Sequence, residues 1–225
     1  TRTSMDYTTG DFFWEAGDHI YVQDDNNVWQ KSSNAPTTKV ATFKFMMPGK
    51  YSSKTSYKVY YPGKSGSNNQ VTIPTTQTQK APDTTIHFGE SGDCGTADAT
   101  KITGKNQFEF SLDHQAAYLV FQPYTSNTIL HDCFVAKIEV TATDGTNIAG
   151  TYPLNTTTGQ LSGNGSSKQI TLITQNPDGG SVWSGLPYAK GFPLNTSTAS
   201  VATNGAYMMV APGKHALRVV YWIHD

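Results

Sequence analysis

Apolar and polar residues alternate in short runs along most of the chain. The clearest runs lie at 20–22, 39–45, 57–61, 71–73, 108–112, 118–121, 138–140, 170–172 and 217–223. A period of two places successive side chains on opposite faces of a sheet. Turn-forming pairs such as Pro62-Gly63 and Asp144-Gly145 end several runs, and Asp24–Asn27 is predicted to be a hairpin turn. The pattern predicts an all-β protein of short antiparallel strands, which is typical of β-sandwiches.

Helical periodicity is weak, and no repeat of fixed length recurs along the chain. The one segment with helix-like spacing, 115–121, contains a run of apolar residues that fits a buried strand better. A polar stretch at 123–127 separates two apolar regions. We therefore predict two tandem antiparallel β-sandwich domains, residues 1–125 and 126–225, with few or no helices. Because the last apolar run ends almost at Asp225, we expect the second domain to be truncated in this sequence.

The composition narrows the possible partners. Charged residues make up 15% of the chain, against about 25% in average soluble domains. Threonine, a β-branched residue that favours strands, occurs 31 times. The net charge of −1 gives no electrostatic basis for binding nucleic acid or anionic lipid. We therefore expect no nucleic-acid partner. No apolar run approaches the 18 residues of a membrane span, so we also expect no membrane span.

Motifs for catalysis or metal binding are not recognisable. The six histidines are scattered, without the short spacings that bring metal ligands together. The glycines at 63 and 104 lack the pattern of a phosphate-binding loop, and no G-x-S-x-G elbow occurs. We therefore expect no catalytic residue, metal or cofactor, and no enzyme. The alternative, a hydrolase, would need a cleft with two acids or a Ser/His pair.

An aromatic loop and two cysteines are the candidates for ligand binding and for a disulfide. The long Gly- and Pro-rich loop at 176–195 carries Trp183, Tyr188 and Phe192, which are candidate ligand contacts for a surface glycan-binding module without catalysis. If these rings pack inward, they are core residues instead. Cys94 and Cys133 are the only cysteines, and the sequence is compatible with either a disulfide or two buried thiols.

Arginine is rare: the chain has two, Arg2 and Arg218, compared with fourteen lysines. Arg218 lies within a predicted strand, whereas Arg2 lies in a polar stretch, 1–10, that we expect to be accessible to a protease. Arg2 is therefore a candidate processing site, although a chance distribution explains the same observation.

The order of several motifs resembles the fimbrillin-like proteins of Bacteroidetes, the family of major and minor fimbrium subunits (type V pilins). The residues that carry the resemblance are Thr1-Arg2-Thr3, Trp14-x-x-Gly17-Asp18-x-Ile20-x-Val22, Phe43, Tyr60-Tyr61-Pro62, Val71-x-Ile73-Pro74-x-x-Gln77-x-Gln79, Phe110-x-x-Asp113-His114-x-x-Ala117-Tyr118-Leu119-x-Phe121, Ala136–Val140 and Ile148–Tyr152. These motifs cover most of residues 1–155. Residues 156–225 match only as generic strands.

The resemblance implies two transthyretin-like β-sandwiches exported as a lipoprotein precursor to the outer membrane. It also implies a structural or adhesive subunit of a surface fimbria (pilus), joined to other subunits by β-strand addition and able to contact host or bacterial surface glycans or proteins. An Arg-specific cut near Arg2 would then release an N-terminal strand. Neither the lipobox cysteine nor a donor segment after Asp225 is part of this sequence.

Overall fold

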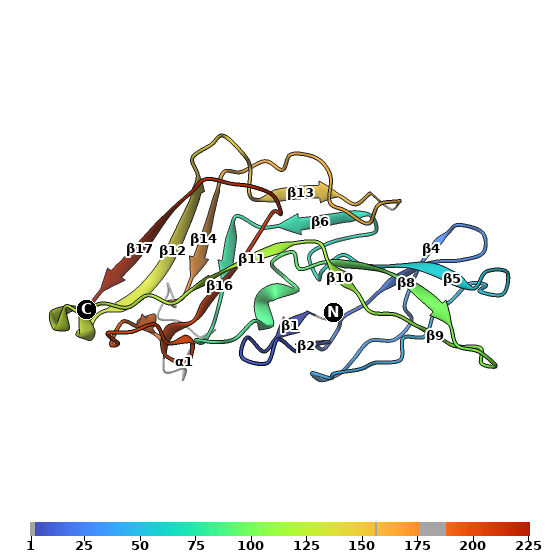
Figure 1. The fold of residues 1–225 in the computed structure, drawn as a ribbon, viewed down its shortest axis with the longest axis horizontal. Helices are drawn as coiled ribbons and strands as arrows, with labels where there is room; N and C mark the ends of the chain where they lie inside the picture. Colours follow the sequence, from blue (N-terminus) through green and yellow to red (C-terminus); the bar gives the residue numbers. More distant parts are fainter. Residues whose placement is uncertain (1–2, 156, 176–187) are drawn as a thin grey trace. The chain divides into compact units, whose positions relative to one another are not determined.

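The computed structural model describes residues 3–155, 157–175 and 188–225. The predicted all-β class is confirmed, because most elements are strands in several mainly antiparallel sheets (Figure 1). Helices in the described residues are short: α1 (Val201–Asn204) and two 3₁₀ helices at Ile86–Phe88 and Thr128–Asp132. The chain forms two compact units, each made of three separate stretches: 1–72, 88–117 and 151–163 in unit 1, and 73–87, 118–150 and 164–225 in unit 2.

Unit 1 is organised around a six-stranded antiparallel sheet with the order β10–β8–β5–β3–β4, in which β9 also pairs with β8. Two short strands, β1 and β2, form a separate pair. The bounds are β1 (Ser4–Met5), β2 (Phe12–Phe13), β3 (Tyr21–Gln23), β4 (Trp29–Lys31), β5 (Ser56–Tyr61), β8 (Gly95–Lys101), β9 (Phe108–Glu109) and β10 (Asp113–His114). Two further strands, β6 (Gln70–Ile73) and β13 (Gly150–Pro153), pair with each other.

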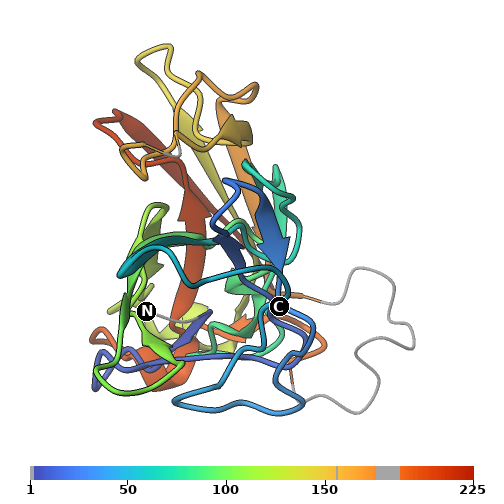
Figure 2. The ribbon, with the colours of Figure 1, turned by 90° about the vertical axis from the view of Figure 1, so that its right-hand side faces the viewer.

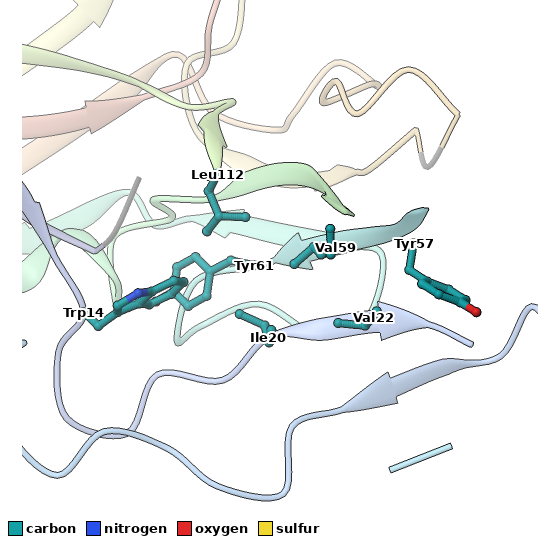
Figure 3. Close-up of a cluster of buried hydrophobic side chains, with 8 residues drawn as sticks. Trp14, Ile20, Val22, Tyr57, Val59, Tyr61 and Leu112 are labelled. Atoms are coloured by element: carbon teal, nitrogen blue, oxygen red, sulfur yellow. The ribbon is translucent and has the colours of Figure 1, made fainter. Parts of the chain in front are cut away.

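Alternating side chains of the sheet form the core of unit 1. Tyr57, Val59 and Tyr61 of β5 are buried on one face, while Lys58 is exposed on the other. The buried cluster comprises Trp14, Ile20, Val22, Tyr57, Val59, Tyr61, Ala99 and Leu112 (Figure 3). Rings meet edge to face, as in the Trp14–Tyr61 pair at 5.8 Å between centroids.

The first strand is fixed to this core by polar contacts. Thr3 donates its hydroxyl to the buried carboxylate of Asp18, and Tyr61 donates its hydroxyl to the same group at 2.9 Å. The side chain of Ser4 donates to Glu15. Thr3, Ser4 and Met5 are all buried, so this part of the stretch 1–10 is not the accessible segment that the sequence predicts. The reason is that short polar side chains can be buried when each has a partner.

Unit 2 contains two layers of strands. In the larger sheet, β12 pairs with β17 along one side and with β14 and β15 along the other, and β7 pairs in parallel with β14. The smaller sheet consists of β11 and β16. The bounds are β7 (Thr76–Thr78), β11 (Ala117–Phe121), β12 (Phe134–Ala142), β14 (Gln169–Ile173), β15 (Phe192–Pro193), β16 (Ala206–Val210) and β17 (Leu217–His224).

Two buried glutamines join the layers of unit 2 at one edge. The amide of Gln77 on β7 accepts from Met209 N–H at 2.8 Å and donates to Met209 C=O at 2.7 Å. Just beyond β7, Gln79 accepts from Tyr207 N–H at 2.7 Å and donates to Gly205 C=O at 2.8 Å. A primary amide offers one acceptor and two donors, so it can pair with a strand much as a backbone does. The side chains thus satisfy the free edge of β16.

Several predicted strands are confirmed, but one is wrong. The runs at 57–61, 138–140, 170–172 and 217–223 lie within β5, β12, β14 and β17, and Asp24–Asn27 forms the turn between β3 and β4. The segment 39–45 is not a strand, because its only ladder contact is a bridge from Val40 to Trp14. Its alternation instead places Phe43 and Phe45 against the core of unit 1.

The units interleave along the chain, whereas the sequence predicts one boundary near 125. The difference arises because the 73–87 stretch supplies β7 to the sheet built by β12 and β14. The 151–163 stretch in turn belongs to unit 1, where Gly159 C=O accepts from the Thr96 hydroxyl at 3.3 Å. The assignment of two tandem sandwich domains to 1–125 and 126–225 stays a prediction.

Replacing Gln77 with methionine should destabilise the protein by about 2–4 kcal/mol. Methionine has nearly the same shape but leaves the buried N–H and C=O of Met209 without their partner, at about 1–3 kcal/mol each. The free energy of unfolding from urea titration measures the effect. Gln169→Met, at an exposed position of β14, is the matched control and should change stability by less than about 0.5 kcal/mol.

Candidate functional site

Strand β17 lies at the edge of the larger sheet of unit 2. All its cross-strand partners lie on β12, from the pair Phe134 and His224 to the pair Ala142 and Leu217. In the part of the chain that the structure describes, no other strand pairs with it. Figures 1 and 2 show β17 in red beside the yellow strand β12. One row of its main-chain N–H and C=O groups therefore faces outward.

The inner face of β17 continues the core but is only half covered. Val219 lies opposite Val140, and Tyr221 lies opposite Ile138. Both β12 residues are fully buried, whereas Val219 is 39% and Tyr221 40% exposed. The smaller sheet reaches β17 through Phe121 of β11, whose ring meets that of Tyr221 edge to face at 6.2 Å. The core layer is thus incomplete at this edge.

The outer face of β17 carries two exposed apolar side chains between Arg218 and His224. Trp222 is 50% and Val220 38% exposed. The Lys137 ammonium lies 4.4 Å from the centre of the Trp222 ring and 2.9 Å from Glu139. Hydrogen bonds from Lys137 and from the Trp222 side chain lower the pKa of Glu139, so this acid stays ionised and holds the lysine over the ring.

A bulge in β12 opens a cavity beside the end of β17. The register shifts between Val135 and Lys137, and the carbonyl of the intervening Ala136 accepts from the N–H groups of Thr174 and Gln175, both at 3.0 Å. The resulting space, about 360 Å³, is lined by Ala136, Lys137, Ile173, Gln175, Trp222, Ile223 and His224. This cavity extends the apolar surface of β17 across the sheet.

The two edges of unit 2 therefore differ. At one edge Gln77 and Gln79 close the smaller sheet. At the other, β17 has no second strand partner in residues 3–155, 157–175 and 188–225, and it carries exposed apolar side chains on both faces. An extended segment laid along β17 would gain main-chain hydrogen bonds and cover the half-exposed side chains at the same time. The arrangement suits strand addition.

The sequence indicated this site only in part. The alternation of Leu217, Val219 and Tyr221 predicts a strand, but their neighbours Val220 and Trp222 are apolar as well. A strand with apolar residues on both faces is expected in the middle of a sheet. The sequence does not show that this strand lies at an edge of the sheet. That position follows only from the strand pairing.

Two of the three predicted ligand-contact residues, Tyr188 and Phe192, lie in the described part of the chain. Phe192 lies in β15 and is 1% exposed, so its ring packs inward, and Tyr188 meets it edge to face at 5.8 Å. Trp183 and Arg2 lie outside the described residues. Cys94 and Cys133 are both free thiols, so the disulfide that the sequence left open is not formed here. Burial raises the pKa of Cys94 well above its usual value, which keeps that thiol protonated.

Groups with catalytic chemistry are sparse. Asp93 is buried, and its carboxylate accepts a hydrogen bond from His114 Nδ1 at 2.7 Å. Burial raises the pKa of Asp93, and the hydrogen bond from His114 lowers it in part. In residues 3–155, 157–175 and 188–225, no group of three or more His, Cys, Asp or Glu side chains could hold a metal ion. None of the helices described there has the length and apolar character of a transmembrane helix.

Comparison of the chain with protein-family models, with curated proteins and with solved structures found no match.

Two facing valines test whether β17 is a surface or a core element. Val140→Thr should cost about 2 kcal/mol, because it buries a hydroxyl in the core. Val219→Thr, directly opposite, should cost less than about 0.5 kcal/mol, because water reaches the hydroxyl. Urea titration of both variants measures the difference. Equal losses would show that the inner face of β17 is covered in solution.

Proposed function

We propose that this protein is a structural or adhesive subunit of a cell-surface fimbria and that it assembles by β-strand addition. The observation that carries the proposal is the edge position of β17, which has no second strand partner among the described residues and carries the exposed Val219, Tyr221 and Trp222. A strand from a neighbouring subunit is the proposed occupant. Such a contact joins two different surfaces, so it continues from subunit to subunit and forms a filament.

The order of motifs that resembles fimbrillin-like proteins supports this proposal. In that family a subunit is exported to the outer membrane and gives up a terminal strand on assembly. The Gln-x-Gln motif at Gln77 and Gln79 belongs to the resemblance and closes one edge of unit 2. The low charge content, 15%, also suits a protein whose surface is buried between subunits.

The first strand is the candidate for release. It pairs with β2 over two residues, and its burial depends on Thr3, Ser4 and Met5. A cut at Arg2 would remove residues 1–2 and leave β1 as a chain end, still joined to Asp6 and held by its pairing with β2 and by the bonds of Thr3 to Asp18 and of Ser4 to Glu15. Displacement of β1 from this position would uncover apolar surface in unit 1 that another subunit's strand could fill.

Charge placed on β17 should abolish assembly. Val219→Lys keeps the fold, because the half-exposed side chain reaches water, but it puts a charge where an added strand would pack. Analytical ultracentrifugation of the native chain should show oligomers that grow with concentration, whereas Val219→Lys should stay monomeric. Val28→Lys, at a 51% exposed valine in the β3–β4 turn, is the control and should assemble normally. A native chain that stays monomeric throughout would contradict the proposal.

Deleting residues 1–10 should destabilise unit 1 and change the oligomeric state. The deletion removes the Thr3 hydroxyl from buried Asp18, whose pKa burial already raises, so the pKa of Asp18 rises further. A raised carboxyl pKa in the folded state means that stability falls as pH rises above the unfolded value of 3.8. Thermal unfolding should therefore show a larger loss at pH 7 than at pH 4. Unchanged stability and oligomer size would contradict strand release.

A further inference from the structure

The sheet of unit 1 carries a row of polar and aromatic side chains on the face opposite its core. Strand register places Tyr21, Tyr60, Thr96 and Asp113 next to one another across β3, β5, β8 and β10. Two residues further along, Lys58 of β5 lies opposite Asp98 of β8. These residues alternate with the buried core residues, so they project to the other side of the sheet.

A wall formed by Leu154, Thr157, Thr158 and Gly159 turns this face into a cavity. The Thr96 hydroxyl donates to the Gly159 carbonyl at 3.3 Å, and a Cβ added at Gly159 would lie 2.7 Å from the Thr96 hydroxyl. Gly159 has a φ of +75°, so glycine permits both the turn and the close approach. The cavity holds about 170 Å³ and is lined by Trp29, Lys58, Val59, Tyr60, Thr96, Ala97, Asp98, Asp113, Leu154, Thr157, Thr158 and Gly159.

The lining combines aromatic rings with hydrogen-bond donors and acceptors. The half-buried Trp29 meets the ring of Tyr60 edge to face at 6.5 Å. Lys58 pairs with Asp98 at 2.9 Å, and both side chains remain about half exposed, so each can also reach a ligand. Asp113 is exposed, and Thr157 and Thr158 add hydroxyls. The buried Tyr60 hydroxyl has no hydrogen-bond partner among the described residues, which leaves one polar group of this lining unmatched.

We propose that this cavity binds one sugar ring, as a monosaccharide or as the terminal residue of a glycan. Sugar hydroxyls both donate and accept, so they match a lining of carboxylates, an ammonium and threonine hydroxyls. The apolar face of the ring can lie against Trp29, as in sites where aromatic rings fix a ligand's orientation. The volume is below the roughly 300–1,000 Å³ of pockets for drug-sized ligands, so it suits a single ring.

The charges disfavour the two other classes of small ligand. A phosphate would face Asp98 and Asp113 with only Lys58 to oppose them, and Lys58 is already paired. A metal ion would find two carboxylates, fewer than the six or more oxygen ligands that calcium takes. A neutral polyol avoids both conflicts. This site lies wholly in unit 1 and is independent of the proposed strand addition at β17.

Proton–nitrogen NMR of the native chain tests the proposal directly. The probes are the methyl glycosides of glucose, galactose, mannose, fucose, N-acetylglucosamine and N-acetylgalactosamine. At least one should shift the indole N–H of Trp29 and the amides of Thr96 and Gly159, with a dissociation constant on the order of 1 mM. If none of the six shifts these signals at about tenfold that concentration, the proposal is overturned.

Variants and competing ligands make the result specific. Trp29→Ala should weaken binding at least about tenfold, and Asp113→Asn should weaken it several-fold, with the amide spectrum confirming that both fold. Tyr124→Ala, at a 58% exposed tyrosine of unit 2, is the control and should bind like the native chain. Inorganic phosphate or calcium chloride shifting the same signals without sugar, or unchanged binding by Trp29→Ala, would overturn the proposal. Oligomeric state plays no part in these readouts, so failure here leaves strand addition unaffected.

Discussion

A strand at the edge of a sheet leaves one row of N–H and C=O groups that needs a partner, and this constraint governs unit 2. Strand β16 meets it through the amides of Gln77 and Gln79, which pair with its main chain as a neighbouring strand would. Strand β17 meets it on one side only, through β12. The difference between these two edges sets which part of unit 2 is closed and which can accept a further strand.

Burial explains why the two edges have different chemistry. A buried backbone group without a partner costs about 1–3 kcal/mol, so the edge covered by the second layer requires polar side chains such as Gln77. The edge at β17 is open to water, which satisfies its backbone groups at little cost. Its apolar side chains, Val219, Tyr221 and Trp222, are therefore the unusual feature, because exposed edges commonly carry charges that prevent association.

The two surfaces that we assign to binding use different kinds of interaction. The β17 edge offers main-chain hydrogen bonds between apolar side chains, which suits an extended polypeptide. The cavity on the sheet of unit 1 offers hydroxyls, carboxylates and one ammonium around two rings, which suits a small polar ligand. A subunit with both surfaces would join its neighbours through one and contact a glycan through the other.

Local alternation is enough to predict the class of fold and most of the strands, because a period of two over runs such as 57–61 and 138–140 places one face in the core. The strand predicted at 39–45 is wrong, because the alternation there packs Phe43 and Phe45 against the core without strand pairing. The rings of Tyr188 and Phe192 make them candidate ligand contacts in the sequence, and only the fold shows Phe192 to be buried. Tertiary structure alone sets which strands are neighbours. It places β17 at an edge, and it brings Lys58, Tyr60 and Asp113 onto one face of the sheet of unit 1. Pairing depends on contacts between residues far apart in the chain, and local alternation carries no information about them.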